Sequence, residues 1–277
     1  MKGIQFEELS SPEIGVLAEK KAVILVPIGA CEEHGRHLPV VTDTRLAYQA
    51  CLDTADKVKD TIPIAVLPPV FYGYSVAVLK NWPGTVTIRP KVLIDFMYDI
   101  CTSLIDMGLD RILIVNGHGN NPGVLDVVVR TVGDDHKVFP GVVNIFNLWD
   151  AQWIRENRKS KEGGISHAGE AETSIMLHLS PELVDMSLAD GTDIMTSSIN
   201  TCPVDPVSPR KKKLFLSTWF VEDSLYGGAG DPSVADAEFG KRIHDMAVNS
   251  LAEVIRDFHD VMEKYDGRIL KRKNTRF

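Results

Sequence analysis

Residues 22–28 read Ala22-Val23-Ile24-Leu25-Val26-Pro27-Ile28 and run directly into Gly29-Ala30-Cys31-Glu32-Glu33-His34-Gly35-Arg36-His37-Leu38-Pro39-Val40-Val41-Thr42-Asp43. The first segment is an apolar run of strand length with too little polar alternation for a half-exposed strand, so it predicts a buried strand of a parallel sheet. In such sheets, ligands bind beyond the carboxyl ends of the strands. The loop that follows therefore lies where a site is expected, and it carries two Glu, two His and an Asp.

Glu32, His34 and Asp43 are residue types that bind metal ions. Imidazole together with carboxylate suits zinc, manganese or iron, and the two oxygens of a carboxylate can bridge a pair of cations. Glu32 and His34 alternate along the chain and can point towards neighbouring metals, while Asp43 follows at the far end of the loop. The same residues also fit a solvated, salt-bridged loop, and Asp43 fits an acidic residue at a helix N-terminus. The loop alone leaves both interpretations open.

The composition bounds the class of protein. A chain of 277 residues, 44% hydrophobic and 25% charged, can bury the core of one large α/β domain or two small ones. Its net charge of −8 argues against nucleic acid as the main partner. With no signal-like N-terminus and no segment of membrane-span length, we expect a soluble cytoplasmic protein that does not bind membranes. Four cysteines without metal-ligand spacing predict free thiols: Cys31, Cys51, Cys101 and Cys202.

The segments around the first loop alternate between helical and strand patterns. Helices are predicted over 11–20, 44–57 and 89–107, a second strand over 62–67, and a short β run over 86–88. Between the last two lies a stiff aromatic loop, Pro68–Ser75, which contains Tyr74 beside Ser75. This loop can line a pocket for a small ligand, or its aromatic residues can simply pack.

A second loop with a metal-capable side chain follows the buried strand predicted over 111–115. It reads Asn116-Gly117-His118-Gly119-Asn120-Asn121. The two glycines allow close approach of the backbone to a ligand, and the Asn side chains can cap a helix that begins near Pro122. Because this loop belongs to the same layer as the first one, His118 is a further candidate ligand.

The second half of the chain contributes a third candidate segment. After a strand predicted over 138–146, the polar residues 155–164 predict a mobile surface loop that can act as a lid. His167 then precedes a helix that runs to Leu179 and carries Glu170 and Glu172. Ordinary acidic bias at a helix start explains both Glu residues, and we expect only one of them to face inward, because residues two apart point to different sides.

The C-terminal part is less informative. Residues 180–209 are rich in loops, and 213–219 predict an edge strand. Ser233 and Asp236 resemble a capping box for a helix that ends near Lys264. The glycines at 227–230 are not a phosphate loop, because no Lys-Ser/Thr follows them.

Three separated motifs resemble those of the creatininase family of metal-dependent amidohydrolases. They are Glu32-x-His34-Gly35-x-His37-Leu38-Pro39 with Thr42-Asp43, then Asn116-Gly117-His118-Gly119-Asn120, and then His167-Ala168-Gly169-x-x-Glu172-Thr173-Ser174. Gly230-Asp231-Pro232 resembles the C-terminal turn of the family, so that the similarity begins near Ile4 and reaches the terminal helix. The resemblance implies an α/β fold, a three-layer α/β/α sandwich with a mostly parallel central sheet. It also implies one domain over residues 1–277 and a homo-oligomer, in many members a homohexamer.

The resemblance further implies two divalent metal ions per subunit, zinc and/or manganese, with iron also compatible with the ligand types. Glu32 and His118 would bind one metal, His34 and Glu172 the other, and Asp43 would bridge them. A water shared by two cations becomes hydroxide near neutral pH and can attack an amide carbonyl. His167 matches the proton shuttle that protonates the departing nitrogen. Gly119, Asn120, Tyr74 and Ser75 are expected to contact the substrate.

Two departures from the family pattern bear on the substrate. Members that act on creatinine carry an acidic residue where this chain has Asn120, and a Trp-Asp pair where it has Gly163-Gly164. Asn120 matches more general members, which include a formamidopyrimidine deformylase and a peptidase that trims a redox-cofactor precursor peptide. We therefore predict hydrolysis of a C–N bond other than a peptide bond, in a small cyclic amide or lactam. A linear amide or formamide is the alternative, and a non-catalytic metal-binding scaffold is the third.

Overall fold

The computed structural model describes residues 3–190, 205–209 and 224–265. Its centre is a sheet of four parallel strands in the order β2-β1-β3-β4, with bounds Ile64–Val66, Val23–Ile28, Arg111–Asn116 and Gly141–Asn144. Val23 is aligned with Ile64 on one side and with Arg111 on the other, and Leu113 with Gly141. Every residue of β1 and β3 is buried, because helices cover both faces of the sheet. The predicted parallel sheet is confirmed.

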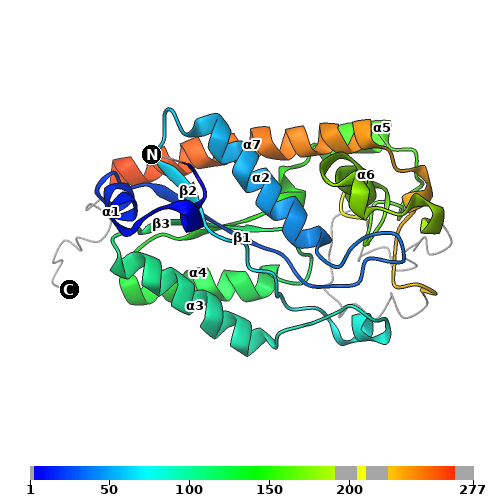
Figure 1. Ribbon diagram of the computed structural model, residues 1–277, viewed down its shortest axis with the longest axis horizontal. Coiled ribbons are helices and arrows are strands. Elements are labelled where there is room, and N and C mark those ends of the chain that lie inside the picture. Colours follow the sequence, from blue (N-terminus) through cyan, green and yellow to red (C-terminus); the bar gives the residue numbers. More distant parts are fainter. Residues whose placement is uncertain (1–2, 191–204, 210–223, 266–277) are drawn as a thin grey trace, which may run out of the picture.

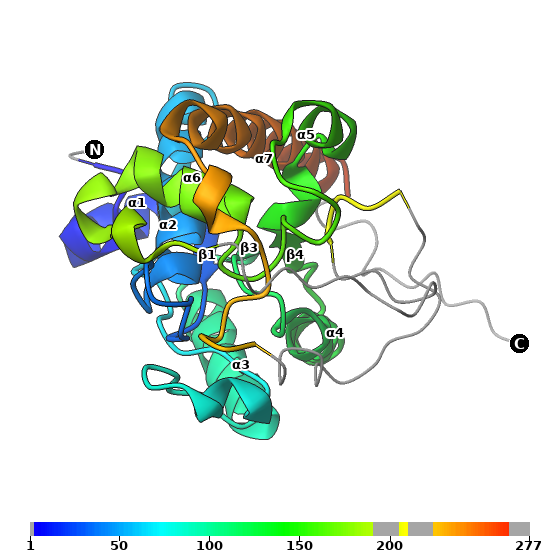
Figure 2. The same cartoon turned by 90° about the vertical axis from the view of Figure 1, so that its right-hand side faces the viewer.

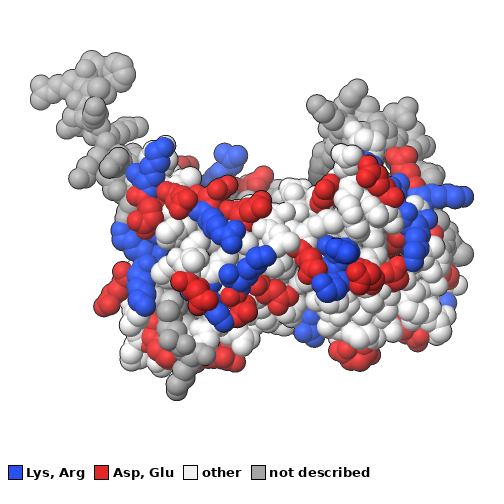
Figure 3. All heavy atoms as spheres, turned by 90° about the horizontal axis from the view of Figure 1, so that it is seen from above, with Lys and Arg blue, Asp and Glu red and all other residues white. Residues whose placement is uncertain are grey.

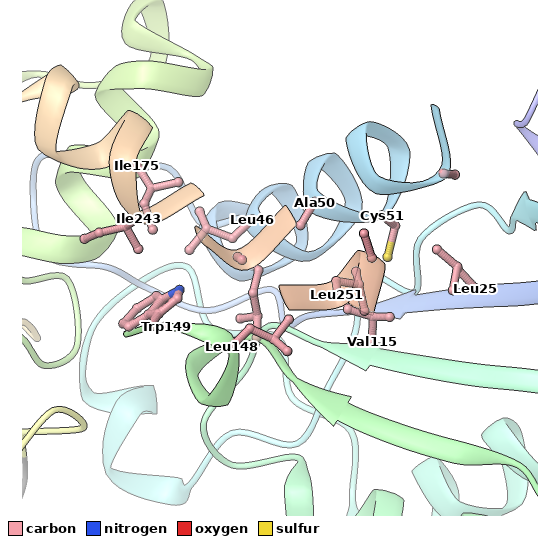
Figure 4. Close-up of a cluster of buried hydrophobic side chains, with 14 of the residues drawn as sticks. Leu25, Leu46, Ala50, Cys51, Val115, Leu148, Trp149, Ile175, Ile243 and Leu251 are labelled. Carbon is pink, nitrogen blue, oxygen red and sulfur yellow. The ribbon is translucent and has the colours of Figure 1, made fainter. Parts of the chain in front are cut away.

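The helices form one layer on each face of the sheet (Figure 1). On one face lie α2 (Thr42–Val58), α6 (Glu170–Leu179) and α7 (Ala237–Tyr265), with the short α5 (Ala151–Asn157) beside them. On the other lie α1 (Ser11–Glu19), α3 (Pro90–Asp106) and α4 (Pro122–His136). Leu25, Leu46 and Leu251 belong to one cluster of buried side chains, which forms the core of the first face (Figure 4). The structure is thus the three-layer α/β/α sandwich expected from the sequence.

Several predicted strand boundaries are too long. The segment 62–67 pairs only over Ile64–Val66, and 138–146 only over Gly141–Asn144, after which Ile145–Leu148 form a 3₁₀ helix. The β run expected over 86–88 is a single antiparallel bridge between Val86 and Cys31. Ile88 N–H donates to Gly73 O (2.9 Å), but this single bond belongs to no ladder, and in the described part of the chain residues 87–88 pair with no strand.

The segment 155–164, predicted as a surface loop, is such a loop only in part. Its first three residues belong to α5, and Ser160, Gly163 and Gly164 are buried. The Glu170 carboxylate accepts the backbone N–H groups of Lys159 (2.8 Å) and Ser160 (2.9 Å). Asp205 Oδ2 accepts that of Gly163 (3.0 Å). Two buried carboxylates therefore hold the segment against the body of the protein.

Capping residues set the starts of α1 and α7. Ser10 caps α1, which begins at Ser11 as predicted, through a capping box with Glu13. Asp236 caps α7 by accepting the N–H of Phe239 (2.8 Å), whereas Ser233 belongs to a preceding turn capped by Asp231. The edge strand expected over 213–219, the basic tail 271–273 and Cys202 lie outside the described residues.

The surface of the layer formed by α2 and α7 carries charges of both signs (Figure 3). On the face that Figure 3 presents, which is the outer side of α2 and α7, basic and acidic side chains are interspersed. Within the described ranges, no helix combines the length and the apolar character needed to cross a bilayer. Cys31, Cys51 and Cys101 are free thiols.

Candidate metal centre

The three segments singled out from the sequence meet at the carboxyl ends of β1 and β3, the end of the molecule that Figure 2 views. Two glycines at the strand ends make this possible. A Cβ atom on Gly29 would lie 2.3 Å from Thr44 N, and one on Gly117 would lie 2.3 Å from Asp43 O. The first turn of α2 therefore packs directly on both strand ends, which places Asp43 between the loops that follow them.

Glu32, Asp43 and His118 form one group of potential ligands. All three are buried, and one side-chain ligand atom from each lies within 4.8 Å of the other two. His118 Nδ1 is 2.7 Å from Asp43 Oδ2, and His118 Nε2 is 3.3 Å from Glu32 Oε2. The side chains thus converge from the β1 loop, α2 and the β3 loop.

His34, Glu172 and His167 form the second group, again with ligand atoms within 4.8 Å of one another. His34 Nε2 is 3.9 Å from Glu172 Oε2, and the rings of His34 and His167 are 4.3 Å apart. Glu172, the third residue of α6, is placed by a hydrogen bond from Ala168 N to its Oε2 (2.7 Å). Glu170 is buried as well, on a different side of the helix, so the expectation that only one of the two faces inward is wrong.

Asp43 connects the two groups. Its Oδ1 lies 3.1 Å from His34 Nε2 in the second group, while its Oδ2 faces His118 in the first. One carboxylate oxygen is therefore directed to each side. This is the arrangement in which a carboxylate can bridge two cations.

Backbone carbonyl groups set the orientation of the two ligand histidines. His34 Nδ1 donates to the carbonyl oxygen of Glu32 (3.0 Å), and His118 Nε2 donates to that of Tyr74 (2.9 Å). Each bond fixes the tautomer and leaves the other nitrogen, His34 Nε2 or His118 Nδ1, directed at Asp43. Metal-binding histidines commonly donate their second N–H in this way.

Buried carboxylates and histidines shift one another's pKa values at the centre. Burial lowers the pKa of His118, but Glu32 and Asp43 outweigh it and raise this pKa to about 9. The pKa of His34 is likewise raised well above its usual value, against burial, by Asp43 and Glu172. Burial raises the pKa of Asp43, yet the two histidines bring it far below its ordinary value. The buried carboxylates thus favour positive charge beside them, and divalent cations can supply it.

Two buried carboxylate oxygens of the ligand candidates have no aligned hydrogen-bond donor. They are Glu32 Oε2 and Asp43 Oδ2, which His118 approaches without hydrogen-bond geometry. Leaving such atoms unpaired costs free energy, so they need a partner. A set of three carboxylates and neutral imidazoles around these oxygens fits divalent zinc or manganese.

Of the residues predicted to contact substrate, Gly119 and Asn120 lie beside His118, exposed and partly exposed respectively. Tyr74 contributes its carbonyl group to His118, while Ser75 is buried with an unpaired hydroxyl. The sequence analysis assigned no role to Glu33, which is also buried at the centre. Its carbonyl oxygen accepts from His167 Nε2 (2.8 Å), and its Oε1 is 3.4 Å from the same nitrogen. The adjacent Glu32 was the only signal in the sequence for this role.

Known proteins of similar sequence and structure agree with this picture. A sequence model of a family described as "Creatininase: Creatinine amidohydrolase" matches residues 7–255. The mycofactocin precursor peptide peptidase of Mycolicibacterium smegmatis is 31% identical over 242 residues, 84% of each chain. The creatinine amidohydrolase of Pseudomonas putida is 26% identical, over 87% of this chain and 91% of that one.

Solved structures show the same likeness. A crystal structure of creatinine amidohydrolase superposes with a TM-score of 0.75 at 26% identity, covering 93% of this chain and 99% of that one. Two further creatininase structures, at 25% identity, are described as a mutant of Zn-Zn type (TM-score 0.75) and as an Mn form (TM-score 0.73). They cover 93% and 92% of this chain, respectively, and 98% of theirs. The likeness thus extends over nearly the whole chain.

Proposed function

The chain belongs to the creatininase family, and from this premise we propose that it hydrolyses the C–N bond of an amide at a pair of divalent cations. The observation that carries the proposal is the position of Asp43, whose two oxygens face the two groups of buried ligands. Homologous hydrolases and Zn-Zn and Mn forms of creatininase support divalent metal use.

We assign Glu32 and His118 to one cation, His34 and Glu172 to the other, and Asp43 to both. When bound, two such cations supply a water of lowered pKa and polarise a carbonyl oxygen. The ligands reach the centre already oriented by Glu32 O, Tyr74 O and Ala168 N, so little rearrangement is needed to bind. We further propose that residues 1–277 fold as one domain.

His167 is proposed to move the proton. Its Nε2–H donates to Glu33 O, so Nδ1 is the nitrogen that faces the centre, 3.5 Å from Glu32 Oε1. Burial and His34 lower the pKa of His167, but Glu33 and Glu32 raise it above the ordinary value. An imidazole of raised pKa is protonated to a greater extent near neutral pH than a free one, and it can deliver that proton to a departing nitrogen.

For the substrate we propose a cyclic amide or lactam other than creatinine, since Asn120 and Gly163-Gly164 replace the residues of creatinine-specific members. A linear amide, peptide bonds included, is the second candidate. Similarity to the mycofactocin precursor peptide peptidases, at 30–31% identity, favours this class. Ring opening yields one product molecule, whereas a linear amide yields two.

The test is turnover by zinc- or manganese-loaded protein of a panel of lactams, formamides, linear amides and short peptides. Products are counted by mass spectrometry. Asp43→Asn should lose bound metal, and its kcat/KM should fall at least about 100-fold. Removing even a residue that only orients a ligand lowers metal affinity or activity about 10- to 100-fold. Asp56→Asn, an exposed acid on the same helix, is the control and should keep both. A full metal complement in Asp43→Asn, or no turnover of any amide by metal-loaded wild type, would contradict the proposal.

A further inference from the structure

A hollow opens beside the candidate metal centre. It is lined by Gly35, Arg36, His37, Ala168, Tyr226 and Gly228, among others. Gly35 directly follows His34 in the chain, and Ala168 directly follows His167. The hollow therefore begins one residue away from both histidines, and a substrate held at the cations can extend into it.

The wall nearest the centre is built from small residues. Cβ atoms placed on Gly35 and on Gly228 would each lie 3.8 Å from the Cβ of Ala168, which is ordinary van der Waals contact. A Cβ atom on Gly35 would also lie 3.2 Å from His37 Nδ1, so the imidazole of His37 adjoins these small residues in the lining of the hollow.

Arg36 supplies a positive charge at this hollow. Its guanidinium carbon lies 4.8 Å from the ring centroid of the half-exposed Tyr226, a cation–π distance. Within the described residues, no carboxylate lies within ion-pair distance of its guanidinium, although Asp190 lines the same hollow. A guanidinium held over an aromatic ring can still donate from the N–H groups at its edge, and this fork of donors matches a carboxylate or phosphate.

We propose that Arg36 binds an anionic group of the substrate, so that the amide cleaved by this protein carries a carboxylate or a phosphate away from its scissile bond. The net charge of −8 repels anions in general, so their attraction to this site needs a local cation. This inference rests on the proposed function. It narrows the substrate to anionic amides and makes Arg36 the residue that selects them.

The experiment compares matched pairs of probes with zinc-loaded protein. The two members of a pair contain the same kind of amide, and only one of them also carries an anionic group. The pairs are 5-oxoproline and 2-pyrrolidinone for lactams and N-acetylglycine and N-methylacetamide for linear amides. In further pairs a phosphate replaces the carboxylate. Binding is measured by calorimetry and turnover as kcat/KM. For at least one pair, the affinity or kcat/KM of the anionic probe should exceed that of its neutral counterpart about tenfold or more. This is the contribution expected of one charge-assisted hydrogen bond.

Arg36→Gln should reduce that preference about tenfold, and Arg36→Lys, which keeps the charge but not the fork, should retain part of it. Arg242→Gln, on the exposed side of α7, is the matched control and should leave the preference intact. The inference would be overturned if Arg36→Gln kept the wild-type preference for anionic probes, or if wild type favoured no anionic probe over its neutral counterpart. Amide turnover in the same assays would still support the proposed function. An Arg36-dependent preference in binding without hydrolysis of any amide would support the anion site and reject the function.

Discussion

At the scale of single residues, Ala168 shows how the centre is held together. Its φ of 55° is left-handed, which costs a residue other than glycine about 1 kcal/mol. Its N–H donates to Glu172 Oε2 (2.7 Å), and its carbonyl accepts from Thr173 Oγ1 (3.3 Å). This turn between His167 and α6 directs His167 and Glu172 to the same group of ligands. The strain is thus compensated by the contacts that assemble the centre.

The first prediction at this scale concerns His167. Replacing it with Ala should lower kcat by about 100- to 10,000-fold, the usual contribution of an acid–base group, while bound metal is retained. Because His167 lies among the ligands of the second group, loss of metal in His167→Ala would instead identify it as a ligand. Metal analysis and single-turnover kinetics on the true substrate distinguish the two. His259→Ala, on the outer part of α7, serves as the control.

At the scale of elements, the crossing of α6 and α7 depends on Gly240. A Cβ atom there would lie 1.8 Å from the carbonyl oxygen of Ser174, so the two helix backbones are in direct contact. Ser174 Oγ also accepts the N–H of Asp236, just before α7. This crossing fixes α6 relative to the sheet, and with it the position of Glu172.

Gly240→Ala should therefore lower the free energy of unfolding by about 1 to 3 kcal/mol, the cost of overpacking. Gly15→Ala in α1 is the matched control, because a Cβ atom at Gly15 meets nothing within 4 Å. There, alanine should stabilise by up to about 1 kcal/mol through its better helix propensity. Urea unfolding of both variants checks the contrast. Two variants of equal stability would mean that the helices do not cross this closely.

A second prediction for the elements concerns the contact between α2 and α7. Asp53 Oδ2 on α2 accepts a hydrogen bond from His244 Nε2 on α7 (2.7 Å). Burial raises the pKa of Asp53, but hydrogen bonds from His244 and Gln49 outweigh it and lower this pKa below its ordinary value. The contact therefore stabilises the fold above the unfolded pKa of about 4 and loses that contribution as pH falls through the folded pKa.

Asp53→Asn should destabilise the protein at pH 7 by up to about 1 kcal/mol, since the carboxylate is half exposed and screened by water. The difference from wild type should narrow as pH falls below about 4. Urea unfolding at several pH values measures it. A difference that is the same at pH 7 and pH 3 would show that the charge of Asp53 contributes nothing.

At the scale of the whole molecule, the candidate centre links segments that are far apart in the chain. Its ligands come from the β1 loop, α2, the β3 loop and α6, which pack on the same end of one sheet. Metal binding to such a centre requires the folded state, so its free energy adds to the stability of the whole. The proposal of a single domain and that of a metal centre can be tested together.

Saturation with zinc at about 100 times Kd should stabilise the protein by about 2.7 kcal/mol and raise Tm by roughly 5 to 10 °C in one cooperative transition. A chelator should reverse the rise, and Asp43→Asn should show little of it. Differential scanning calorimetry gives both Tm and the number of transitions. Two separate transitions would reject the single domain, and a Tm indifferent to metal in wild type would reject the centre.

The sequence alone was sufficient for the buried strands, the layered α/β class and the main ligand candidates. β1 and β3 are uninterrupted apolar runs, and Glu32, His34 and His118 follow them within a few residues, so local pattern determines both. Asp43 could be read equally well as an acid at a helix start. The motif resemblance, and not the residue pattern, separated the two readings.

Tertiary structure alone decided what depends on contacts between distant residues. Residues 155–164 look like a solvent-exposed loop, yet the carboxylates of Glu170 and Asp205 bury part of it. The role of Glu33 beside His167, like the hollow between Arg36 and Tyr226, joins residues more than a hundred positions apart. Local propensity depends on a few neighbouring residues. The position of a buried charge depends instead on its hydrogen-bond partners, and these come from distant segments that only the fold brings together. That is why the strands could be predicted from the sequence and the surroundings of the centre could not.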